Sequence, residues 1–172
     1  MTGIKRKIFL SKVYKLTPLI LLYFSVLNEF DFNYLNFNLF SFNFTSILIF
    51  YWCLKGYENL GYVHIFIAGL INDVVIGFPM GVSAFSYLLI CGFSAYLRNI
   101  TLRPSLLNDW FFFLFTILVV TSVNYILLSF IFSAEINYYD LLGNIIFTFF
   151  LYIIFAYIFN KFQKITFKES ND

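Results

Sequence analysis

Apolar residues run along the chain in long blocks that short polar stretches separate. Because the hydrocarbon core of a bilayer is about 30 Å thick, a helix that crosses it needs roughly 20 apolar residues. Blocks of about this length predict six membrane-spanning helices in a single integral membrane domain over residues 1–172. The predicted spans are 9–30, 37–55, 61–77, 80–98, 109–133 and 140–160.

Two of these spans are less regular than the others. The span 61–77 is short and would sit nearly upright or thin the bilayer locally. The segment 30–44, FDFNYLNFNLFSFNF, enters the span 37–55 and alternates aromatic with polar residues. A period of two is typical of a strand, but an isolated strand leaves backbone groups unpaired in lipid. We therefore interpret 30–44 as an interfacial loop or half-helix with aromatic anchors.

The composition supports a membrane protein. The chain is 61% hydrophobic and 12% charged, with a mean hydropathy of +0.84. A soluble domain of this size would expose large apolar patches, whereas lipid covers them in an integral membrane protein. Cys53 and Cys91 fall inside predicted spans without metal-ligand spacing, so packing roles are expected. The basic N-terminal stretch lacks an A-x-A-type cleavage site, which favours a retained first helix.

The basic residues predict the orientation. With six spans, all eleven lie on one side of the membrane, and the connections near 31–36, 77–80 and 134–139 contain none; five spans would break this pattern. Basic residues concentrate on the cytoplasmic side, so both termini are expected in the cytoplasm. The basic residues are Lys5, Arg6, Lys7, Lys12, Lys15, Lys55, Arg98, Arg103, Lys161, Lys164 and Lys168.

The third and fourth spans are predicted to form a helical hairpin. Its turn is the stretch GFPMG at 77–81, because Pro79 has no N–H with which to continue a helix and the glycines permit positive φ. A face of mostly small residues on each span predicts that the two faces pack closely on each other or on a common neighbour. On one span these are Gly69 and Gly77, with Asp73 between them, and on the other they form the stripe Gly81, Ala84, Leu88, Cys91 and Ala95.

Asp73 is the one acid well inside a predicted span, where a carboxylate is costly. Three interpretations are open. Asp73 could accept hydrogen bonds from a neighbouring helix, for example from Ser122 or Asn124, which we favour because intramembrane polar groups commonly pair. It could lie near the outer end of its helix and receive backbone donors from a broken segment. It could also contact a partner protein or a solute.

The sequence contains no recognisable catalytic constellation. We find no nucleophile–base pair, no metal-ligand spacing and no phosphate-binding loop, so no catalytic, cofactor-binding or metal-binding residue is predicted. The single histidine, His64, lies beside Tyr62 near the end of a span and is interpreted as interfacial.

The stretch 47–98 resembles the family of the rod shape-determining protein MreD. The resemblance rests on a Tyr-Trp pair at the end of a span, a glycine after a short loop, a G-[LI]-x-x-D pattern, and a following glycine and small turn. It covers about a third of the chain, and prolines common in the family are replaced by Phe42-Asn43-Phe44 and Lys55-Gly56-Tyr57. The residues that match, together with the turn proline, are Tyr51, Trp52, Gly61, Gly69, Asp73, Gly77, Pro79 and Gly81.

The resemblance implies a non-enzymatic inner-membrane subunit of the bacterial cell-elongation machinery, which controls cell shape through lateral peptidoglycan synthesis. Its expected partner is a single-span MreC-like protein. MreB, a SEDS-type glycosyltransferase and a class B penicillin-binding protein are expected as indirect partners. The implied fold is similar to the substrate-binding subunits of energy-coupling-factor transporters.

Two other functions compete with this one. The chain could be a substrate-binding subunit of a vitamin transporter of the energy-coupling-factor type. Such subunits usually carry a small-x-x-x-small motif in their first span, and LTPLILLYFSVLNEF lacks one. The outward loops are also poor in polar ligands for a vitamin. An intramembrane enzyme is the third hypothesis, and it depends on Asp73 alone.

Overall fold

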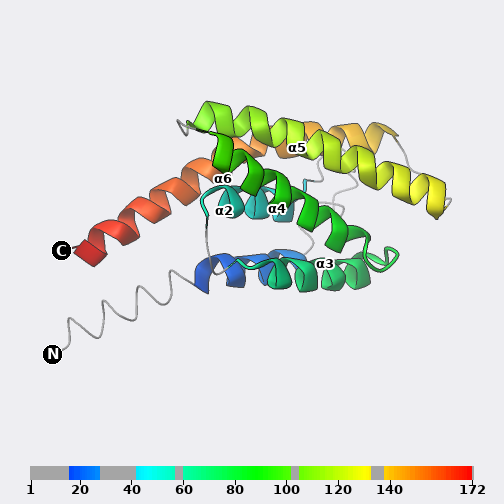
Figure 1. Cartoon of the computed structure of the whole chain (residues 1–172), viewed down its shortest axis with the longest axis horizontal. Coiled ribbons are helices and arrows are strands. Elements are labelled where there is room, and N and C mark those ends of the chain that lie inside the picture. The colour runs from blue at the N-terminus through cyan, green and yellow to red at the C-terminus, as the bar shows by residue number, and fades with distance from the viewer. Residues whose placement is uncertain (1–15, 28–41, 57–59, 102–104, 133–137, 172) are drawn as a thin grey trace, which may run out of the picture.

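The computed structural model describes residues 16–27, 42–56, 60–101, 105–132 and 138–171, with side chains described to residue 163 at the C-terminal end (Figure 1). All regular structure in these ranges is helical, so the predicted all-helical class is confirmed. The helices are Leu16–Leu27, α2 Phe44–Leu54, α3 Tyr62–Ile76, α4 Val82–Ile100, α5 Leu106–Ile126, which continues as the π-helix η3 Leu127–Ile131, and α6 Tyr138–Asn171.

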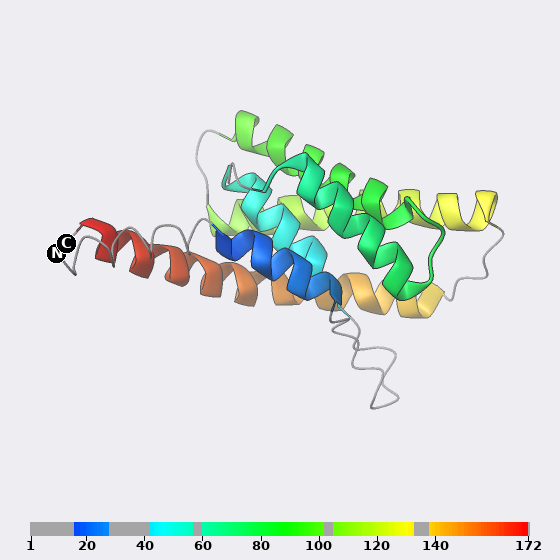
Figure 2. The same ribbon diagram turned by 90° about the horizontal axis from the view of Figure 1, so that it is seen from below.

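The helix α2 forms the centre of the bundle. Every residue from Thr45 to Leu54 is buried. Helix Leu16–Leu27 contributes Ser25, whose Oγ accepts a hydrogen bond from the Thr45 hydroxyl at 3.0 Å. On other sides α2 contacts α4, α5 and α6 (Figures 1 and 2). A helix that is apolar on all sides is stable when other helices surround it. The helix α2, FTSILIFYWCL, is apolar over most of its surface and is surrounded in this way.

The predicted start of the second span is wrong for the part that the structure describes. Phe42 and Asn43 are not helical, and α2 begins only at Phe44. The reason is a cap, because the Asn43 side chain accepts a hydrogen bond from the Ser46 N–H at 3.0 Å, which favours a helix start at this position. Residues 37–41 of the predicted span lie outside the described residues.

Within the described ranges, two helices are long and apolar enough to cross a membrane. They are Leu106–Ile131, which comprises α5 and η3, and Tyr138–Gln163 within α6, each of 26 residues. In the most apolar stretch of each helix, only 28% and 22% is buried inside the bundle. The core helix of a soluble protein is, in contrast, mostly buried. At 1.5 Å per residue, α2 with its 11 residues and α3 with its 15 are shorter than the hydrocarbon core.

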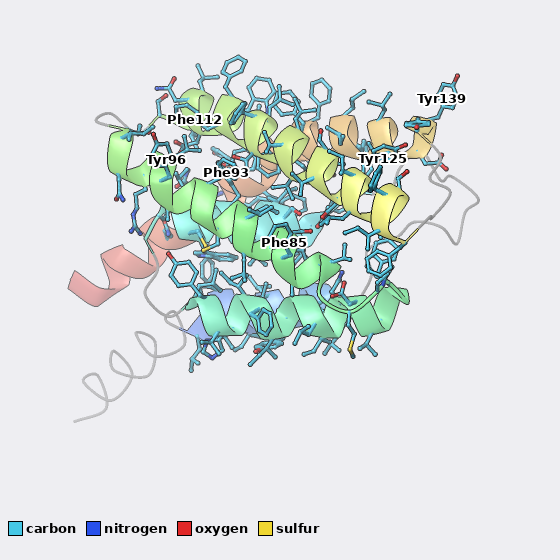
Figure 3. The ribbon with its side chains drawn as sticks, turned by 45° about the vertical axis from the view of Figure 1, so that its right-hand side comes forward. Phe85, Phe93, Tyr96, Phe112, Tyr125 and Tyr139 are labelled. Carbon is cyan, nitrogen blue, oxygen red and sulfur yellow. The ribbon has the colours of Figure 1, made fainter. Side chains whose placement is uncertain are left out.

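Aromatic rings fill the interface between α5 and α6. The Trp110 ring stacks on the Phe149 ring at a centroid distance of 4.4 Å, and its Nε1–H donates to the Phe149 carbonyl oxygen at 2.9 Å. The Phe113 and Tyr152 rings also stack at 4.4 Å. Further aromatic side chains line α4, α5 and the start of α6, among them the labelled Phe85, Phe93, Tyr96, Phe112, Tyr125 and Tyr139 (Figure 3).

The basic residues whose side chains the structure describes gather at one end of the bundle. Lys55 lies at the end of α2, and Arg98 reaches the neighbouring Gly56 from the last turns of α4. Lys161 of α6 lines the same pocket as Lys55. The turn between α3 and α4 lies at the opposite end (Figure 1).

Candidate functional site

The turn between α3 and α4 forms as the sequence predicts. The helix α3 ends at Gly77, which adopts a left-handed conformation with φ of 77°. The helix α4 begins after Gly81, whose φ is 102°. Pro79 lies between them, and its carbonyl oxygen accepts a hydrogen bond from the Val82 N–H at 3.3 Å. Both glycines therefore lie at positions where the backbone needs a positive φ. Residues other than glycine rarely adopt this conformation.

Asp73 joins the two ends of this turn. Its backbone carbonyl oxygen accepts from the N–H groups of Gly77 and Phe78 at 3.0 and 2.9 Å, which closes α3. Its side chain is fully buried. The carboxylate oxygens accept from the Gly81 N–H at 2.7 Å and the Ser83 N–H at 2.8 Å, which opens α4. A carboxylate is stabilised there by backbone donors and by the positive end of the helix dipole.

Asp73 does accept a hydrogen bond from a neighbouring helix, at the Ser83 N–H of α4, but the suggested donors Ser122 and Asn124 are wrong. The Asn124 Oδ1 accepts from the Ser86 hydroxyl at 2.5 Å, and the Ser122 hydroxyl donates to its own helix at Leu118. The second interpretation holds, since backbone donors of the following segment satisfy the carboxylate. The charge needs no donor from α5 because the N-terminus of α4 supplies two N–H groups that have no partner within their own helix.

The packing of α3 on α4 is closest at Gly69. A Cβ atom placed on Gly69 would lie 2.3 Å from the Ala84 Cα and 2.6 Å from the Ala84 nitrogen. Nearby, the Asn72 side-chain amide donates to the Ser83 hydroxyl at 3.0 Å. The predicted packing of the two small-residue faces on each other is therefore confirmed at this point. Gly77 differs, because a Cβ there would meet nothing within 4 Å, and its role is conformational.

The remaining candidate residues lie apart from this turn. The Tyr51 hydroxyl donates to the Asn160 Oδ1 at 2.8 Å, and the Trp52 ring lies 4.7 Å from the Phe159 ring. Both contacts fasten α2 to α6. Gly61 precedes α3 with an ordinary φ of −65° and has room for a side chain. The structure thus gathers Gly69, Asp73, Gly77, Pro79 and Gly81 into one unit and places Tyr51, Trp52 and Gly61 elsewhere.

Sequence reasoning missed an ion pair at the opposite end. The Lys55 Nζ lies 3.4 Å from the Asp109 Oδ2, and Asp109 is buried although it lies in the first turn of α5. Ser105 caps this helix by accepting from the Asn108 N–H at 3.2 Å. The signal in the sequence was Asp109, an acid that follows the helix-capping Ser105 within one turn.

The described residues show no group of three or more histidine, cysteine, aspartate or glutamate side chains placed to hold a metal ion. Cys53 and Cys91 are both free and buried, and their sulfur atoms face each other at 2.8 Å. The fold and the turn define an all-helical protein in which a buried carboxylate clamps a helical hairpin. No protein-family model, no curated protein and no solved structure matches the chain.

Proposed function

We propose that the chain is a non-enzymatic, multi-pass subunit of the bacterial inner membrane that resembles MreD and helps to organise lateral peptidoglycan synthesis. The observation that supports this most is the hairpin at 62–100. The motif residues Gly69, Asp73, Gly77 and Gly81, on which the resemblance rests, each have a physical role in holding this hairpin together. A subunit that positions partners needs such a fixed element.

In the proposed placement, six helices cross the inner membrane, and both termini lie in the cytoplasm. The outward sides of α5 and α6 then face lipid, which suits their exposed Phe111, Phe115 and Phe150 side chains. The end that holds Lys55 and Lys161 faces the cytoplasm, in accord with the positive-inside rule. The short α3 is accommodated by local thinning of the bilayer. The fold that the resemblance implies for this placement is similar to the substrate-binding subunits of energy-coupling-factor transporters.

The partner contact is proposed at the tip of the α3–α4 hairpin, on the periplasmic side. Phe78 and Met80 are exposed there, with 75% of Met80 accessible. A single-span MreC-like protein would contact these apolar side chains and connect the chain indirectly to MreB, a SEDS-type glycosyltransferase and a class B penicillin-binding protein. The small-residue face of α3 is a poor alternative, because Gly69 is already packed on Ala84.

Co-purification with a tagged MreC-like protein tests this proposal. The variant Met80→Glu should lose the partner at unchanged expression, because a charge would enter an apolar contact. Phe130→Glu is the matched control, since Phe130 is 86% exposed but belongs to η3, and it should retain the partner. If both variants retain the partner equally, the hairpin tip does not contact the partner. If the parent chain does not co-purify with the MreC-like protein, the proposed function is refuted.

Two further measurements decide between the alternatives. Single cysteines placed at Lys55 or Arg98 should react only with reagents that reach the cytoplasm, in a chain whose two native cysteines are replaced by alanine. Labelling from the periplasm would refute the six-span placement. A vitamin that co-purifies with the chain or raises its Tm would instead support the transporter subunit.

A further inference from the structure

Two adjoining hollows lie where α2, α5 and α6 meet at the basic end of the bundle. The first has a volume of about 450 Å³, and its polar lining comprises Lys55, Ser105, Asp109, Asn160 and Lys161. The second, of about 300 Å³, runs along α6 and is lined by apolar side chains such as Ile153, Ala156 and Ile158. Leu106 and Tyr157 line both, so the two hollows lie side by side, and we treat them as the apolar and the polar part of one pocket.

The polar part has an excess of positive charge. Asp109 pairs with Lys55 at 3.4 Å, and Lys161 forms no ion pair among the residues that the structure describes. Two lysines against one aspartate leave a formal charge of +1 at the pocket. This is equal and opposite to the charge of a phosphate diester, and basic pockets between helices on the cytoplasmic side are suited to lipid head groups.

A second observation points to a ligand. The Tyr152 hydroxyl is buried and has no hydrogen-bond partner among the described residues, although buried polar groups are almost always paired. Tyr152 lines the apolar part of the pocket, and its ring packs against Phe50 and Phe113. The apolar part therefore adjoins a buried hydroxyl that lacks an acceptor, and the ester oxygens of a lipid are acceptors of the kind it lacks.

We propose that this pocket binds one anionic phospholipid of the cytoplasmic leaflet. The phosphate lies between Lys55 and Lys161, and one acyl chain follows the groove along α6. A partner helix fits less well, because a helix about 10 Å across would fill 300 Å³ in less than one turn and would have to lie over the groove. The proposal depends on the membrane placement given above and is independent of the MreC-like partner.

The head-group contact is tested with the full chain in nanodiscs that contain equal amounts of phosphatidylglycerol and phosphatidylcholine. Lipid that remains bound after detergent extraction is quantified by native mass spectrometry. The parent chain should retain phosphatidylglycerol preferentially, and Lys161→Gln should reduce this preference about fivefold. Arg98→Gln removes the same charge at the same end outside the pocket lining and should change it little. Equal reduction in both variants would overturn the site, because it would show a diffuse surface charge only.

The acyl-chain contact is tested by filling the groove. Ile153→Trp should reduce retained phosphatidylglycerol, whereas Ile146→Trp, at an exposed position of α6 outside the groove, should not. Thermal unfolding of both variants checks that they fold. Inorganic phosphate and glycerol phosphate serve as soluble probes. If either one displaces the lipid at millimolar concentration and Ile153→Trp has no effect, the pocket is a phosphate site and the lipid proposal is wrong.

The outcomes also separate this proposal from the proposed function. A chain that sediments with membranes and binds the MreC-like partner, but shows no preference for phosphatidylglycerol, would refute the lipid site alone. A chain that retains phosphatidylglycerol selectively but fails to bind the partner would refute the elongation role alone.

Discussion

The two helical pairs of this bundle are held together in different ways. In the α3–α4 pair, Gly69 lets two backbones approach closely, and Asp73 bonds directly to backbone N–H groups. In the α5–α6 pair, large rings separate the helices, and stacked Trp110 and Phe149 rings form much of the contact. The α3–α4 interface therefore depends on a few close contacts between individual atoms. The α5–α6 interface depends on the contact area of several aromatic side chains.

This difference predicts unequal tolerance to substitution. Backbone atoms in contact cannot move apart by a change of side-chain rotamer. A buried N–H that loses its acceptor costs the full desolvation penalty of that group. Stacked rings can shift and keep most of their contact area. The α3–α4 pair should therefore be fixed in geometry, as the proposed partner contact at its tip would require, whereas the α5–α6 pair should tolerate changes of shape.

The largest effect is expected for Asp73→Ala. This change leaves the N–H groups of Gly81 and Ser83 without their acceptor, and we expect a loss of about 3 kcal/mol in the free energy of unfolding, since bonds to charged acceptors contribute about 1.5–3 kcal/mol each. Reversible unfolding in mixed micelles measures it. Asp73→Asn retains one acceptor oxygen and should lose about half as much. A loss in Asp73→Ala below that of Trp110→Phe would reverse the comparison.

The next effect is expected for Gly69→Ala. The added methyl group overlaps the Ala84 backbone, so the helices must separate, at an expected loss of about 2 kcal/mol. Gly92→Ala is the matched control in the neighbouring helix, because a Cβ there meets nothing within 4 Å. The control should leave the unfolding free energy unchanged or raise it slightly. If the two variants unfold alike, the close approach of α3 and α4 is not present.

A smaller effect is expected for Trp110→Phe in the α5–α6 pair. The substitution keeps a stacked ring on Phe149 but removes the Nε1–H that donates to the Phe149 carbonyl oxygen. The expected loss is about 1 kcal/mol, the usual contribution of a neutral hydrogen bond. The same unfolding titration measures it, and a loss as large as that of Asp73→Ala would show that this pair also depends on single atoms.

The smallest effect is expected for Phe115→Leu. Phe115 is exposed on α5, where lipid faces it in the proposed placement, and surface changes of this kind usually alter stability by less than about 0.5 kcal/mol. Phe113→Leu is the buried counterpart two residues earlier and should lose more, because its ring packs between Phe50 and Tyr152. Equal losses would mean that the outward side of α5 is covered by protein.

The sequence by itself determined the helical class, the approximate place of each helix and the turn between α3 and α4. These follow from local causes, since long apolar blocks form helices and Gly77, Pro79 and Gly81 act on their own φ angles. The spacing of small residues also predicted that α3 and α4 pack on each other or on a common neighbour, and the contact of Gly69 with Ala84 decides for the first. Each of these features is encoded within a few consecutive residues or in one helical period.

Only the tertiary structure decided which atoms satisfy Asp73, which helix is central, and that Lys55 pairs with Asp109. A buried acid has many possible donors in a sequence, and the choice of Gly81 and Ser83 depends on how sharply the chain turns back. The burial of α2 and the pairing of Lys55 with Asp109, 54 positions apart, depend on how separate helices are arranged. Such contacts are not encoded locally, because they arise when distant faces of the chain bury one another.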